Sequence, residues 1–95
     1  MRLIITYGRD DESLMIKSIV EFAVGIAREK YGVPIEVYEV QLEGIKGVRV
    51  ELEGNGEVHL EEAPSLNDLV EALVVAGSLL KSSTPYIGGE TLATG

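Results

Sequence analysis

The spacing of hydrophobic and polar positions changes along the chain, and each change predicts a new element. Residues 2–7 form a short apolar run that ends at Gly8, which is typical of a buried strand. Apolar residues then recur at helical spacing up to Tyr31, and Gly32 supplies a C-terminal cap. We expect this helix to bury the stripe Met15, Ile19, Phe22, Ala23, Ile26 and Ala27, widened by Leu14, Ile16, Val20 and Val24.

A second strand is predicted over residues 35–42, where the alternation changes phase. Ile35 and Val37 share one face, whereas Val40 and Leu42 share the other. Either both faces of this strand are partly covered or a bulge interrupts it. The long helix before this strand favours a parallel, right-handed crossover from the first strand.

The next segment predicts a β-hairpin with one apolar and one charged face. Its apolar positions are Val48, Val50, Leu52, Val58 and Leu60. A three-residue turn over residues 54–56 pairs Leu52 with Val58 and keeps the apolar residues on one face. The same register sets Glu51 opposite His59, which is a favourable cross-strand pair.

A second helix begins after Pro64, where Ser65 supplies an N-cap. Its buried stripe is expected to comprise Leu66, Leu69, Val70, Leu73, Ala76 and Leu80. Val74, Val75 and Leu79 lie outside that stripe and need cover from another surface, so they are the candidate interface. Residues 82–95 are polar and glycine-rich and predict a flexible C-terminal tail after a domain over residues 1–81.

The order strand, helix, strand, strand, strand, helix predicts a single α/β domain, as a chain of 95 residues allows. We expect a two-layer sandwich with a mixed four-stranded sheet in the order 2-1-3-4. Both helices should cover one face of this sheet.

The composition excludes several kinds of chemistry. The chain has no cysteine, which excludes disulfides, thiol catalysis and thiolate metal sites, and His59 is its only histidine. A net charge of -8 disfavours nucleic acid and anionic membranes as partners. We therefore expect no cofactor, no metal site and no catalytic residues. No apolar run reaches the roughly 18 residues of a membrane span, so a cytoplasmic protein is expected, and scarce Asn and Gln fit a heat-adapted source.

Three segments carry a resemblance to a known fold family. They are residues 4–11, which lead from a strand into a helix, the hairpin over residues 48–58, and the helix start at residues 63–69. Together they resemble a thioredoxin-like fold that lacks its middle helix, closest in layout to the selenoprotein W-like and glutaredoxin-like families. In those families a Cys-x-x-Cys or Cys-x-x-Sec motif follows the first strand. Gly8 and Asp11 stand at the matching positions here, so the resemblance implies the fold without the redox activity.

The loop Gly8, Arg9, Asp10 and Asp11 is the candidate ligand site, because it lies between the carboxyl end of a strand and a helix start. Its backbone N–H groups could hold an anion. Asp is also the expected N-cap residue, and we favour capping by Asp10 or Asp11 over ligand binding.

Three functions are compatible with these patterns. The first is a redox-inactive binding or assembly module that forms a homodimer or takes a protein partner, because its apolar surface exceeds what one two-layer domain hides. The second is a small enzyme or ligand-binding protein that uses the loop at residues 8–11 for an anionic small molecule. The third is a ferredoxin-like regulatory domain, which requires a further strand near Tyr86 and Ile87.

Overall fold

The computed structural model describes residues 1–83 of the chain, with side chains up to Ser78, and its elements follow the predicted order. The elements are β1 (Arg2–Tyr7), α1 (Asp11–Tyr31), β2 (Glu36–Gln41), β3 (Val48–Leu52), β4 (Glu57–Leu60) and α2 (Leu66–Ser83). The further strand considered near Tyr86 and Ile87, and nearly all of the predicted tail over residues 82–95, lie outside the described residues.

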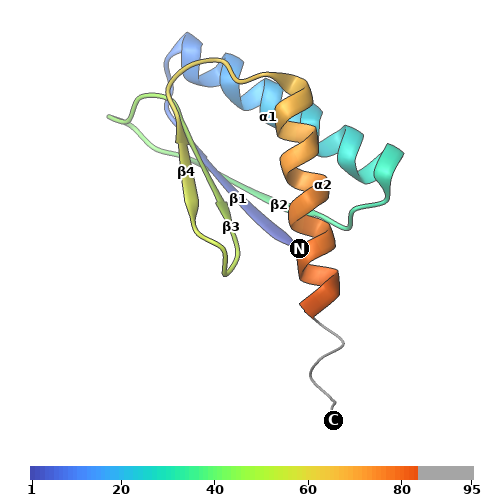
Figure 1. Ribbon diagram of the computed structural model, residues 1–95. Coiled ribbons are helices and arrows are strands. Elements are labelled where there is room, and N and C mark those ends of the chain that lie inside the picture. Colours follow the sequence, from blue (N-terminus) through green and yellow to red (C-terminus); the bar gives the residue numbers. More distant parts are fainter. Residues whose placement is uncertain (84–95) are drawn as a thin grey trace.

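The four strands form one mixed sheet in the order β2-β1-β3-β4. β1 pairs in parallel with β2 and antiparallel with β3, and β4 pairs antiparallel with β3. Both helices lie on one side of this sheet, where they cross and pack against each other (Figure 1). The predicted α/β class, strand order and two-layer arrangement are therefore confirmed.

The hydrophobic core lies between the central strands and α1. Leu3 and Ile5 of β1 and Val48 of β3 point into it and are almost completely buried. Ile16 and Val20 of α1 pack against them. Burial of each of these side chains contributes about 1.5–3 kcal/mol relative to an exposed position.

The buried face of α1 differs from the predicted stripe. Its buried residues are Ser13, Ile16, Val20, Ala23, Val24 and Ala27. Met15 and Phe22 were expected inside, yet they are 48% and 63% exposed. The rotation of the helix follows from Ser13, whose buried hydroxyl accepts a hydrogen bond from the N–H of Gly47 at 2.8 Å. Apolar residues surround most of α1, so periodicity alone did not determine which of two overlapping stripes faces the sheet.

The change of phase in β2 has a different cause from either predicted explanation. The register with β1 is continuous over Glu36–Gln41, so there is no bulge, and Val40 is exposed on the sheet face away from the helices. Glu39 takes the inward position instead, because Lys17 of α1 lies over it with Nζ 3.6 Å from Oε1. The same ammonium group lies 4.6 Å from the centre of the Tyr7 ring. An ion pair at the edge of the helix layer therefore replaces an apolar contact.

The hairpin keeps the predicted apolar face but changes its register by two residues. Val50 pairs with Val58 rather than with Leu60, and His59 lies opposite Arg49 rather than opposite Glu51. The turn starts earlier than predicted because Gly54 and Gly56 both adopt positive φ angles, of 80° and 91°. The N–H of Asn55 consequently donates to the carbonyl of Leu52 at 2.8 Å.

Candidate functional site

The loop between β1 and α1 is a tightly bonded helix start. Asp10 is the N-cap, and its carboxylate accepts hydrogen bonds from the N–H of Ser13 at 3.1 Å and from the Ser13 hydroxyl at 2.6 Å. These two bonds hold the pKa of Asp10 below its usual value. The predicted capping function is thus confirmed and assigned to Asp10.

The loop between β2 and β3 packs against this helix start. The N–H of Gly8 donates to the carbonyl of Gly47 at 3.2 Å, and the N–H of Gly47 donates to the Ser13 hydroxyl. A Cβ atom on Gly8 would collide with the carbonyl oxygen of Ile45. The backbone therefore leaves no room for any side chain at the position that matches the first cysteine in the resemblance.

The other two residues of this loop point to solvent. Arg9 forms an exposed ion pair with Glu43, with 3.3 Å between Nη1 and Oε2, and Asp11 is exposed at the start of α1. The Asp10 carboxylate already occupies the positive end of the helix, where an anion would bind. The hydrogen bonds of this loop thus hold the start of α1 in place. Anion binding by residues 8–11 stays a prediction.

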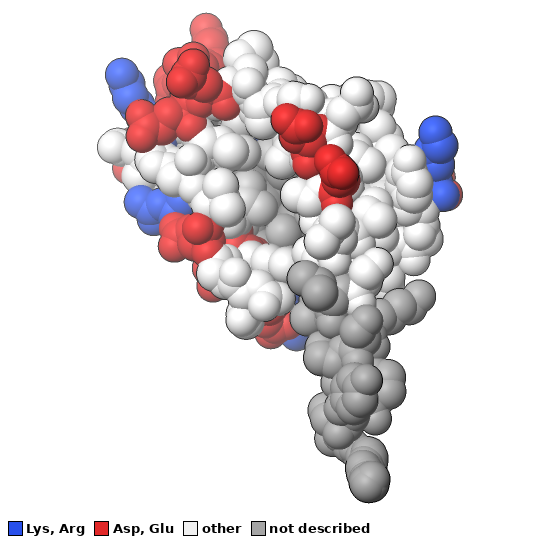
Figure 2. All heavy atoms as spheres, viewed as in Figure 1, with Lys and Arg blue, Asp and Glu red and all other residues white. Residues whose placement is uncertain are grey.

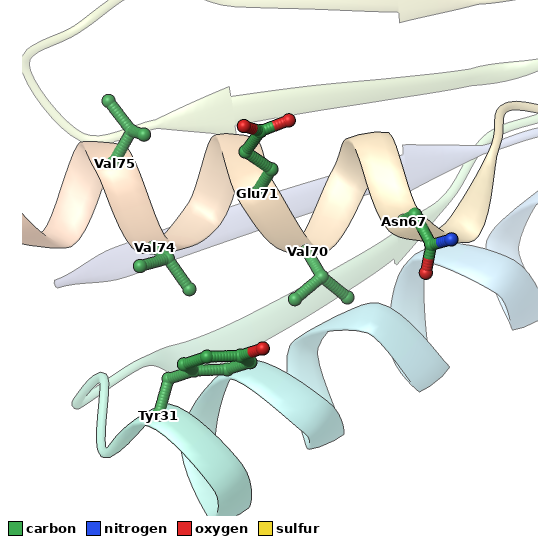
Figure 3. Close-up of a pocket in the computed structure, with 6 residues that line it drawn as sticks. All are labelled: Tyr31, Asn67, Val70, Glu71, Val74 and Val75. Carbon is green, nitrogen blue, oxygen red and sulfur yellow. The ribbon is translucent and has the colours of Figure 1, made fainter.

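Two of the candidate interface residues, Val74 and Val75, line a groove between α1 and α2, which we call the α2 groove. It has a volume of about 510 Å³ and is lined by Tyr31, Asn67, Val70, Glu71, Val74 and Val75. Val70 and Val74 point from α2 toward the Tyr31 ring, whereas Glu71 and Val75 point away from it (Figure 3). The groove therefore has apolar walls on two helices and one carboxylate along its upper side.

Two glycines determine the positions of the residues on either side of the α2 groove. Gly32 ends α1 in the left-handed conformation, with φ 67°, and leaves Tyr31 at the helix end opposite α2. Gly77 lies directly against Val33, because a Cβ atom there would come within 2.8 Å of Val33 Cγ1. The close approach at Gly77 anchors α2 beside the segment that follows α1.

The exposure of the groove residues agrees in part with the sequence interpretation. Val75 is 51% exposed, as expected of a residue outside the buried stripe, whereas Val74 is partly buried and packs against the core, and their role as an interface stays a prediction. The side chain of Leu79 lies outside the described residues. The sequence interpretation missed Tyr31, which is 52% exposed. Its position immediately before the capping Gly32 was the available signal, since such a residue projects from a helix end.

The other flank of α2 carries a second apolar groove, which we call the hairpin groove. It has a volume of about 340 Å³, and its walls include Leu52, Val58 and Leu60 of the hairpin and Leu69 and Leu73 of α2. Figure 2 shows this uncharged hollow between the hairpin and α2, with acidic side chains around it. Val58 is 59% exposed there, because α2 packs mainly against α1 and leaves the hairpin face partly uncovered.

A third apolar area lies where α1 meets the start of α2. Ser18, Ile19 and Phe22 of α1 meet Pro64 and Leu66 at the start of α2. Phe22 has the largest exposed fraction of the described large hydrophobic residues. Apolar surface thus runs along the junction of the two helices and on both flanks of α2.

The charged residues that the structure describes around the α2 groove and the hairpin groove are acidic. Glu71 borders the α2 groove and Glu57 borders the hairpin groove. His59 lies on the opposite face of the sheet, where Nε2 is 2.9 Å from the carbonyl oxygen of Lys46. Within residues 1–83, no group of three or more metal-ligating side chains converges, and no helix is long and apolar enough to cross a membrane.

The three apolar areas can bury apolar groups of a ligand, and carboxylates lie beside two of them. Val75, Tyr31 and Phe22 are all more than half exposed. No nucleophile with an adjacent base lies in the described lining of the α2 groove. Neither models of known protein families nor curated protein sequences match this chain.

Proposed function

We propose that the protein is a redox-inactive binding module that takes an apolar segment of a partner protein along α2. The observation that carries this proposal is the exposed apolar surface on and beside that helix, with Val75, Tyr31, Val58 and Phe22 all more than half exposed. Contiguous exposed apolar surface of this kind marks protein–protein contact sites in soluble domains. An aromatic side chain beside a valine-lined depression also suits a binding hot spot.

The proposal includes a thioredoxin-like fold without the redox function. The strand order β2-β1-β3-β4 and the directions of the strands support this relationship. The chain has no cysteine, and the carbonyl of Ile45 fills the space beside Gly8. The corner between β1 and α1 thus positions α1 but does not present a reactive group.

The acidic residues around the grooves support a proposal for the chemistry of the partner. Glu71 and Glu57 border the two grooves, and the whole chain carries a net charge of -8. An acidic surface of this kind favours a partner segment that combines apolar residues with Lys or Arg. An amphipathic helix would satisfy both requirements, because its apolar stripe can lie between α1 and α2 while its basic residues face the carboxylates.

Photo-crosslinking of the full-length chain tests the proposal. A photoreactive phenylalanine analogue is placed at Val75, and a matched protein carries it at Glu12, which is exposed at the other end of the helix layer. Both proteins are irradiated in lysate of the source cells. We expect one partner to be cross-linked from position 75 and not from position 12, through a peptide that contains apolar and basic residues.

Two results would contradict the proposal. One is the same set of adducts from both positions, and the other is a partner that still binds after Val75→Asp. The proposal also includes the cytoplasmic location expected from the sequence, which cell fractionation tests directly.

A further inference from the structure

The outer edge of β2 is the opposite edge of the sheet from β4. Within residues 1–83, no strand pairs with this edge, since β2 is the first strand in the sheet order. Natural edge strands are often protected by Pro, Lys, a bulge or a covering loop. The sequence of β2, EVYEVQ, contains neither Pro nor Lys, its register with β1 is uninterrupted, and its only charged residues are Glu36 and Glu39.

The hydrogen bonds to β1 show which backbone groups remain at this edge. The N–H groups of Glu36 and Leu42 donate to the carbonyls of Met1, just before β1, at 2.8 Å and of Tyr7, at the end of β1, at 2.9 Å. Successive residues of a strand point their backbone groups in opposite directions. The residues between those two therefore alternate, and Val37, Glu39 and Gln41 direct their N–H and C=O groups outward.

The same segment carries an exposed apolar stripe on the sheet face away from the helices. Tyr38 is 48% exposed, and Val40 and Leu42 are each 43% exposed. Ile4 lies beside Tyr38 in the register of β1 with β2 and is partly buried. This stripe directly adjoins the free edge, so a strand added there would contact it along its length.

Charge selects one antiparallel register for a second copy of the same strand. With Val40 opposite the partner's Val40, Glu39 lies opposite the partner's Gln41 and Tyr38 lies opposite the partner's Leu42. A shift in one direction places Glu39 opposite the partner's Glu39, and a shift in the other places it opposite the partner's Glu43. Like charges directly opposite each other destabilise a strand pair. Of these three neighbouring registers, only the Val40-centred one avoids such pairs and also joins apolar residues to apolar residues.

We propose that two copies of this chain associate through β2, with Val40 on the two-fold axis, to form one continuous eight-stranded sheet. The outward groups of Glu39 and Gln41 then supply the backbone hydrogen bonds across the axis. A two-fold axis makes this contact self-complementary, as in most homodimers. The inference does not depend on the proposed function, because none of the residues that line the α2 groove belongs to β2.

The helix side of the edge has space for the partner's side chains. A hollow of about 240 Å³ lies there, lined by Glu21, Val24, Gly25, Arg28, Val37 and Glu39. In the proposed register the partner's Gln41 lies beside Glu39, and its amide N–H can donate to the carboxylate. The pair therefore gains a polar contact on one face and an apolar contact on the other.

Single-cysteine variants of the full-length chain test both the dimer and its register. Wild-type protein should have twice its monomer mass of 10.2 kDa in light scattering. Val40→Cys should form an intermolecular disulfide under mild oxidation, because directly opposed residues of this type have Cα atoms about 4.5 Å apart. Tyr38→Cys is the matched control, since its two copies would lie about 13 Å apart along the strands. The natural chain has no cysteine, so no other thiol competes.

Charge variants complete the test. Val40→Asp should give a monomer with an unchanged circular dichroism spectrum, whereas Val75→Asp should stay dimeric. A wild-type monomer at every concentration would overturn the inference. Equal disulfide formation by Tyr38→Cys and Val40→Cys would overturn the register, and loss of the dimer in Val75→Asp alone would assign dimerisation to α2 instead.

Discussion

Replacement of Ser13 by alanine should destabilise the fold more than its small change in volume suggests. Ser13 is completely buried, and its hydroxyl joins two segments that lie far apart in the sequence. It donates to the Asp10 carboxylate at 2.6 Å and accepts from the N–H of Gly47 at 2.8 Å. The alanine variant removes both bonds and leaves the buried N–H of Gly47 without its acceptor.

The magnitude follows from that buried N–H group. An unsatisfied buried donor costs about 1–3 kcal/mol, and loss of the bond to Asp10 acts in the same direction. Alanine recovers up to about 0.7 kcal/mol through its higher helix propensity. We therefore expect the free energy of unfolding to fall by about 1–3 kcal/mol, which is a substantial part of the roughly 5–15 kcal/mol typical of a small domain.

Urea denaturation followed by far-ultraviolet circular dichroism measures this change. Ser18→Ala is the matched control, because Ser18 lies on the same helix and its hydroxyl donates to the carbonyl of Leu14 at an exposed position. The control has the same gain in helix propensity and leaves no buried donor unpaired. If Ser13→Ala is as stable as Ser18→Ala, the hydroxyl does not connect the corner to the loop that contains Gly47.

Three further predictions concern other parts of the fold. Gly8→Ala should lower the melting temperature, because its Cβ atom would displace the carbonyl of the facing loop; a wild-type melting temperature would refute this contact. In urea denaturation, Ile16→Ala should lower the free energy of unfolding by about 2–5 kcal/mol, whereas Phe22→Gln should change it by less than about 0.5 kcal/mol. A larger loss for Phe22→Gln than for Ile16→Ala would show that Phe22 lies in the buried stripe, as the sequence predicted. A hydrogen bond to Glu39 and burial raise the pKa of Glu21 above its value in the unfolded chain. Protonated Glu21 therefore stabilises the fold at pH values below the unfolded pKa, and this stabilisation is lost as pH rises through the folded pKa. Glu21→Gln should therefore be more stable than wild type at neutral pH and similar to it in acid, and parallel pH profiles of melting temperature would contradict this assignment.

The elements and their order follow from local patterns in the sequence. The β-branched run before Gly8, the cap at Gly32 and the alternating hairpin each depend on residues close together in the chain. Such signals identify strands and helices and their connections, and the connections limit the sheet to few topologies. This is why the strand order was predictable.

The errors arose where a contact between distant segments decided the outcome. The rotation of α1 depends on the hydrogen bond between Ser13 and Gly47, which are 34 residues apart. The inward position of Glu39 depends on Lys17 of α1. Periodicity contains no information about either contact, so the exposure of Phe22 could not be predicted from it. The surface near Val75 was predictable because apolar residues there exceed one helical stripe.

The central claim is that α2 binds a partner protein, and the affinity of that partner tests it most directly. The partner cross-linked from position 75 is purified, and its Kd for wild-type protein and for Val75→Asp is measured by isothermal titration calorimetry. The claim predicts that Val75→Asp raises the Kd by about tenfold or more, because a carboxylate would replace an apolar contact in the groove. An unchanged Kd in a correctly folded Val75→Asp protein would contradict it.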